Sequence, residues 1–168
     1  MKPSTLYRML PVLVLLAAAP SHAAGAGWKS WNAGMAEAKA TGRPVLVDVY
    51  TDWCGWCKRM DRDVYSRADV RDYLAKKFVM IKLDAESSDQ ATYEDRSMTM
   101  GAIAQRFKVT GYPTTIFLRA NGEHLVNVPG YVPAERFMLM LEYIGDDHIG
   151  RGVKWTDFEK RGGVATER

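Results

Sequence analysis

The chain has 168 residues, of which 47% are hydrophobic and 26% charged, and its formal net charge at pH 7 is +3. Two of the 23 basic residues and none of the 20 acidic ones fall in the first 23 positions, leaving 21 basic against 20 acidic residues. This near-neutral balance argues against nucleic acid or an anionic surface as partner, and the length suits one domain with a sizeable core.

Residues 1–23 have the layout of a cleavable secretory signal. A short basic start is followed by an apolar centre over residues 9–19 and by small residues up to Ala23. The centre is shorter than the roughly 20 apolar residues that a membrane-spanning helix needs. We therefore expect cleavage after Ala23, export to the periplasm and no stable membrane insertion of the mature protein. An uncleaved anchor is the alternative.

Residues 24–145 carry the patterns of one α/β domain, and residues 146–168 form a C-terminal extension. Residues 28–40 predict a helix that ends at a Gly-Arg-Pro sequence. Residues 45–50, VLVDVY, are short, β-branched and continuously apolar apart from one aspartate. Such a run is typical of a strand that is covered on both faces.

This strand leads into the only two cysteines, Cys54 and Cys57. Met60 and Val64 continue the apolar side of Cys57 at helical spacing, so we expect a helix to begin at Cys54. The free N–H groups and dipole of a helix N-terminus stabilise an anion, and lower a cysteine pKa from about 8.5 to about 3.5–7.5. We therefore predict that Cys54 is the nucleophile and that Cys57, deeper and shielded, resolves a mixed disulfide.

A structural bridge and a zinc site are the alternative roles of the cysteine pair. A bridge that closes so small a loop removes little chain entropy, so it is a poor staple. Zinc needs four ligands, and His22, His124 and His148 do not stand at ligand spacing from the pair. We expect a redox-active Cys54–Cys57 disulfide, no metal and no other cofactor.

The next segments predict a parallel crossover and a long loop. Residues 66–77 have a helical pattern, and residues 78–83 form a strand that we expect to pair in parallel with residues 45–50. Residues 84–97 are polar and acid-rich, and predict an exposed loop leading into a helix that reaches about residue 107. A calcium loop fails on the missing glycine and the ligand order. Partner selection and a plain solvated loop are the two interpretations of this segment.

Asn121-Gly122 predicts a hairpin between strands at 114–118 and 125–128, with both central turn residues at positive φ. Pro133 suits the first turn of a last helix, which Gly145 ends. In the extension, two aromatic residues predict a helical turn that packs back on the domain: Trp155 and Phe158.

Several of these motifs together resemble the thioredoxin superfamily. They are Asp48 six residues before Cys54, Trp53 directly before it, Lys58 after Cys57, and Gly111-Tyr112-Pro113-Thr114 downstream. The WCGWCK sequence is most similar to exported bacterial thioredoxin-like and disulfide-isomerase-like proteins, and the resemblance covers roughly residues 28–145. It implies a thioredoxin fold, with a central mixed sheet of four to five strands flanked by helices.

The resemblance also implies a substrate groove. A cis Tyr112–Pro113 bond would face the N-terminus of the CxxC helix, and Gly130 would lie beside the groove. The residues implied to contact substrate are Trp53, Gly55, Trp56, Tyr112, Pro113 and Gly130.

Asp48 is the third residue to which we assign chemistry. Its apolar neighbours should desolvate the carboxylate, which raises its pKa and suits it to exchange protons near neutral pH. The resemblance implies a general acid/base that assists Cys57, and an acid on an exposed strand edge is the alternative. The lysine that the family places beside this aspartate has no clear counterpart, because Lys82 falls on the wrong side of its strand if Asp84 is aligned.

The function implied by the resemblance is thiol–disulfide exchange with protein substrates. We expect a reductase that a membrane electron donor recharges. The inner dipeptide Gly55-Trp56 differs from the Gly-Pro of typical thioredoxins, so an isomerase or oxidase is the alternative. A non-redox peptide-binding module and a metallochaperone are further alternatives.

Overall fold

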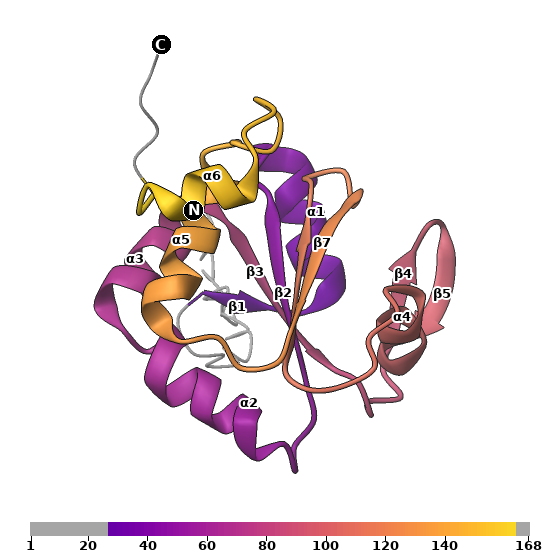
Figure 1. Cartoon of the computed structure of the whole chain (residues 1–168). Coiled ribbons are helices and arrows are strands. Elements are labelled where there is room, and N and C mark those ends of the chain that lie inside the picture. The colour runs from indigo at the N-terminus through magenta and orange to yellow at the C-terminus, as the bar shows by residue number, and fades with distance from the viewer. Residues whose placement is uncertain (1–26, 164–168) are drawn as a thin grey trace, which may run out of the picture.

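The computed structural model describes residues 27–163, and the predicted signal and cleavage site lie outside this range. Its centre is a five-stranded mixed sheet with strand order β1-β3-β2-β6-β7 (Figure 1). The strands are β1 (Trp28–Lys29), β2 (Val45–Tyr50), β3 (Val79–Asp84), β6 (Thr114–Leu118) and β7 (His124–Pro129). The predicted mixed sheet flanked by helices is therefore confirmed.

Strand β2 lies at the centre of the sheet. It pairs in parallel with β3 and antiparallel with β6, as a crossover followed by a returning strand requires. The crossover contains α2 (Gly55–Met60), a π-helical turn η1 (Asp61–Tyr65) that continues it, and α3 (Ala68–Lys77). The helix that we predicted from residue 66 thus begins at Ala68.

Helices cover both faces of the sheet (Figure 1). On one face α2, α3 and α5 (Ala134–Gly145) pack on a cluster that includes Leu46. On the other, α1 (Trp31–Thr41) and α4 (Met100–Arg106) pack on a cluster that includes Val45, Val47 and Val49. Because side chains alternate along a strand, Asp48 points to the same face of the sheet as Leu46.

The predicted loop at 84–97 is partly wrong, because residues 90–99 form a second, two-stranded sheet. β4 (Gln90–Tyr93) and β5 (Arg96–Thr99) form an antiparallel hairpin whose two turn residues have positive φ. The Trp31 indole N–H donates to the Thr92 carbonyl at 2.9 Å, which ties the hairpin to α1. The strand signal in the sequence is weak here, because each strand is four residues long and half of the residues in each are exposed.

The hairpin between β6 and β7 is confirmed, but its turn differs from the expected form. Of the two central residues only Gly122 has positive φ, at 89°. The Gly122 N–H donates to the Arg119 carbonyl, and the Arg119 N–H to the Glu123 carbonyl. A three-residue loop with glycine at its left-handed position gives this pattern.

The C-terminal extension packs back on the domain, as predicted. Helix α6 (Trp155–Lys160) lies against α5, and Phe158 is fully buried. The Phe158 ring lies 5.3 Å from that of Tyr143 on α5 and 4.5 Å from that of His148. In residues 27–163, no helix combines the length and hydrophobicity required to cross a bilayer.

Candidate active site

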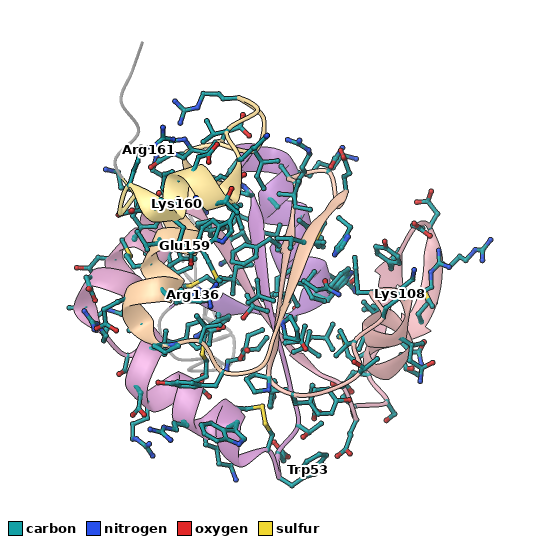
Figure 2. All side chains as sticks on the ribbon, viewed as in Figure 1. Trp53, Lys108, Arg136, Glu159, Lys160 and Arg161 are labelled. Atoms are coloured by element: carbon teal, nitrogen blue, oxygen red, sulfur yellow. A yellow bond between two sulfur atoms is a disulfide. The ribbon has the colours of Figure 1, made fainter. Side chains whose placement is uncertain are left out.

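Cys54 and Cys57 form a disulfide where β2 gives way to α2. Cys54 is the N-cap of the helix, and its Sγ accepts a hydrogen bond from the Cys57 N–H at 3.0 Å. The Cys54 N–H donates to the Thr51 carbonyl at 3.1 Å. The pair lies at one edge of the molecule beside Trp53 (Figure 2). A thiolate at Cys54 would accept the same N–H and meet the positive end of the helix dipole.

The two cysteines do not differ in depth in this oxidised state. Cys54 is 4% exposed and Cys57 3% exposed, although we expected Cys57 to be the more shielded. Because the disulfide joins the two side chains, both are buried to a similar extent. The assignment of Cys54 as nucleophile therefore depends on its position at the helix N-terminus and not on its exposure.

Two exposed tryptophans lie close to Cys54 in the chain, Trp53 before it and Trp56 after it. Trp53 is 66% exposed and Trp56 is 55% exposed, and no other large hydrophobic side chain in residues 27–163 is classed as exposed. The Trp53 ring lies 6.0 Å from that of Tyr112, and the Trp56 ring 5.6 Å from that of Tyr131. Exposed aromatic side chains are typical of surfaces that contact partners.

The loops that carry these tyrosines contact each other. The Tyr112–Pro113 peptide bond is cis. The Gly130 N–H donates to the Pro113 carbonyl at 2.8 Å, with Gly130 at a φ of +81° that favours glycine. Gly55, the first residue of α2, is exposed, and a Cβ added there would meet no atom within 4 Å beyond its chain neighbours and its own helix backbone. Three of the predicted substrate-contact residues therefore stand next to the cysteines in the chain: Trp53, Gly55 and Trp56. The other three are linked to this segment indirectly, Tyr112 through its ring contact with Trp53, Pro113 as the next residue, and Gly130 through its hydrogen bond to Pro113.

Asp48 is 1% exposed and lies in a network of polar side chains. Its Oδ2 is 2.5 Å from Lys82 Nζ, and its Oδ1 accepts from the Tyr65 hydroxyl at 3.4 Å. Lys82 Nζ also lies 2.6 Å from Asp61 Oδ1. Burial raises the pKa of Asp48, the Lys82 charge opposes that shift, and the Asp61 charge adds to it.

The prediction that Lys82 lies on the wrong side of its strand is wrong. Parallel pairing places Asp48 opposite Lys82 and Tyr50 opposite Asp84, so the side chains of each pair share a face. Lys82 and Asp84 stand two residues apart and also share a face. The β2–β3 register is the signal that would have found the pair. Sequence reasoning also missed Asp61 and Tyr65, which the π-helical turn η1 supplies.

Burial and pairing also decide the state of the residues around Asp48. Burial disfavours the charged form of Lys82, but Asp48 and Asp61 outweigh it, so the pKa of Lys82 is raised. Burial and the neighbouring carboxylate hold the pKa of Tyr65 well above its usual range, which keeps the phenol protonated. The arrangement can hold one proton on the buried Asp48 carboxyl or, when that proton leaves, balance the carboxylate with the Lys82 ammonium group.

The histidines that we considered as zinc ligands lie in other contacts. His124 contacts the Asn127 side chain at 2.8 Å, and His148 stacks on Tyr143, while His22 lies outside the described residues. Over residues 27–163, no three His, Cys, Asp or Glu side chains gather as metal ligands.

A family model for the thioredoxin-like domain matches residues 31–145. The chain belongs to the thioredoxin-like domain family. The match ends where helix α5 ends, so the extension that carries α6 lies beyond it.

This thioredoxin-like chain is similar to curated thiol–disulfide proteins. It is 42% identical over 105 residues to the thiol:disulfide interchange protein DsbD of Ralstonia nicotianae. The matched region covers 62% of this chain but only 16% of DsbD. It is 27% identical over 115 residues to the disulfide bond reductase DsbH of Chlamydia pneumoniae, covering 68% of each chain.

Solved structures agree with the fold. A thioredoxin from Thermus thermophilus matches with a TM-score of 0.60 and 26% identity, covering 74% of this chain and 91% of that one. A thioredoxin-fold protein from Helicobacter pylori matches with a TM-score of 0.64 and 22% identity, covering 72% and 80%. The thioredoxin fold implied by the sequence motifs is confirmed.

Proposed function

We propose that this thioredoxin-like protein is an exported thiol–disulfide oxidoreductase that reduces disulfides in protein partners. The observation that carries the proposal is the Cys54–Cys57 disulfide at the N-terminus of α2, with an exposed tryptophan before and after Cys54 and a buried carboxyl, Asp48, on the strand that leads into it. The similarity to an interchange protein and to a disulfide bond reductase supports the same chemistry. Electrons are carried on the cysteine pair, with no further cofactor.

In the reduced protein the Cys54 thiolate attacks one sulfur of a partner disulfide. The partner's S–S bond breaks, one partner thiolate leaves and takes a proton, and Cys54 is joined to the other partner sulfur. The Cys57 thiolate then attacks Cys54 Sγ, which releases the second partner thiol and forms the Cys54–Cys57 disulfide. Two electrons have passed to the partner, and a dithiol donor must reduce the pair again.

Asp48 serves the second step as the base that removes the Cys57 proton. Its raised pKa brings it closer to neutral pH, where a base can both accept and release a proton. The Lys82 ammonium stabilises the ionised form of Asp48, and this carboxylate is the form that accepts the Cys57 proton. In this proposal six residues contact the partner: Trp53, Gly55, Trp56, Tyr112, Pro113 and Gly130.

The direction and compartment of the reaction are part of this proposal. The predicted signal in residues 1–23 supports export, with the periplasm as the compartment. An exported reductase has to draw electrons across a membrane, so we propose a membrane-bound dithiol protein as its donor.

A Cys57→Ser variant tests the proposal. Without the resolving thiol, mixed disulfides through Cys54 should accumulate when the reduced variant meets a cell extract, and should appear as bands on non-reducing gels that reductant removes. The double variant Cys54→Ser, Cys57→Ser is the control and should give none. Equal banding from the two variants, or no bands from either, would count against the proposal.

A further inference from the structure

The two aromatic pairs beside the disulfide differ in the charges that they hold. On one side the Trp53 indole N–H donates to Glu86 Oε1 at 2.9 Å, and Asp52 precedes Trp53 in the chain. Both acidic residues are exposed. The Trp53–Tyr112 side of the site therefore carries negative charge.

The Trp56–Tyr131 side carries positive charge. The Arg59 Cζ lies 5.2 Å from the centre of the Trp56 ring and 5.4 Å from that of the Tyr131 ring. This guanidinium therefore contacts both rings of the pair, and its side chain is still 50% exposed. Cation–π contact of this kind holds a guanidinium in place.

Arg59 has N–H groups that can donate hydrogen bonds to a partner's carboxylate. Its Nε donates to Asp63 Oδ2 at 3.1 Å, and within the described part of the chain no hydrogen bond occupies its Nη1 or Nη2. Asp63 is shared with Arg62, whose Nε lies 2.8 Å from Asp63 Oδ1, so one carboxylate faces two arginines. An arginine fixed against aromatic rings with a free fork of N–H groups is suited to a carboxylate.

Trp53 and Trp56 stand on either side of Cys54 in the chain, so a segment that brings a sulfur to Cys54 meets both aromatic pairs. We infer that the site selects partner segments by charge polarity. The segment that carries the partner's cysteine has an acidic side chain on the Trp56–Arg59 side and a basic side chain on the Trp53–Glu86 side. This inference rests on the proposed function, because it names the class of protein substrate for the same site.

Two synthetic peptides of identical composition test this selection. One has Glu two residues before its cysteine and Lys two residues after it, the other has these two residues exchanged, and each is used as its symmetric disulfide dimer. In an extended segment, side chains two positions from the cysteine point to the same side as the cysteine. Because the net charges are equal, long-range attraction cannot separate the two peptides.

The measurement is the rate at which each peptide oxidises the reduced protein in a single turnover. We expect one order to react about fivefold faster than the other, the size that exposed ion pairs give. The ratio should fall towards one in high salt, which screens exposed charges. Equal rates for the two peptides would overturn the inference and leave the proposed function standing, whereas no reaction with either peptide would overturn both.

A matched pair of variants assigns the effect to Arg59. Arg59→Glu should bring the ratio to one or invert it, and Arg59→Gln should reduce it. Arg71→Glu, an equal change of charge at an exposed arginine on α3, should leave the ratio as in the wild type. A ratio that Arg59→Glu leaves unchanged, or that both charge reversals change equally, would overturn the assignment.

Discussion

At the residue scale, the proton exchange that we propose for Asp48 depends on Lys82, which contacts two carboxylates. Its ammonium contacts one fully buried carboxylate, Asp48, and one half-exposed carboxylate, Asp61. The rings of Trp28 and Tyr50 lie about the same ammonium at 4.8 and 5.2 Å. Burial still governs Asp48, whose pKa is raised despite the ion pair. The folded protein thus binds a proton on this carboxyl more tightly than the unfolded chain does.

Asp48→Asn should therefore stabilise the protein in a pH-dependent way. With a pKa raised by folding, the contribution of Asp48 to stability is fully present below about pH 4 and is lost as pH rises through the folded pKa. We expect the variant to be more stable than the wild type at pH 8, with the difference shrinking towards pH 4. Lys82 keeps Asp61 as its partner in the variant.

Urea unfolding of the oxidised proteins at several pH values measures this difference. Asp72→Asn removes an exposed carboxylate on α3 and is the control, with no pH-dependent gain expected. A loss of stability in Asp48→Asn at pH 8, or a gain that does not vary with pH, would contradict our account of this carboxyl.

At the element scale, the continuous segment α2–η1 builds most of the site. Its start supplies both cysteines, and its π-helical turn supplies Asp61 to Lys82 and Tyr65 to Asp48. Turns of this kind are frequent at functional sites. Spacing predicted where α2 begins, since Cys57, Met60 and Val64 share an apolar side. The π-helical turn has no proline or glycine to mark it, so it could not be predicted.

The extension is a second element whose contribution can be measured. Phe158 is fully buried among Tyr143, His148 and Trp155, so Phe158→Ala leaves a cavity under α6. We expect a loss of about 3–5 kcal/mol in the free energy of unfolding. Peptide disulfide reduction below the transition should be unchanged, because the contacts of Phe158 lie in α5 and the extension.

Asp157→Ala, on the exposed side of the same helix, is the control for Phe158→Ala and should cost little. Equal effects of the two substitutions on urea unfolding would show that α6 is not packed as described.

At the scale of the whole molecule, patterns within single segments could be predicted and pairings between segments could not. The apolar run 45–50 and the Cys54–Cys57 spacing predicted the central strand and the helix that follows it. The contact between Asp48 and Lys82 depends on the β2–β3 register, and the contact between Arg59 and Tyr131 on the position of the chain after β7. Such pairings follow from tertiary structure, which periodicity along one segment does not contain.

The reduction potential of the Cys54–Cys57 pair tests the central claim most directly. The purified protein is equilibrated in thiol buffers of defined potential, and its free thiols are trapped and counted. We predict a reversible two-electron equilibrium at about −270 mV, the value typical of thioredoxin and suited to a reductase. A potential of about −120 mV, that of a strong oxidant, would contradict the proposed direction. A pair that cannot be cycled would contradict the redox function itself.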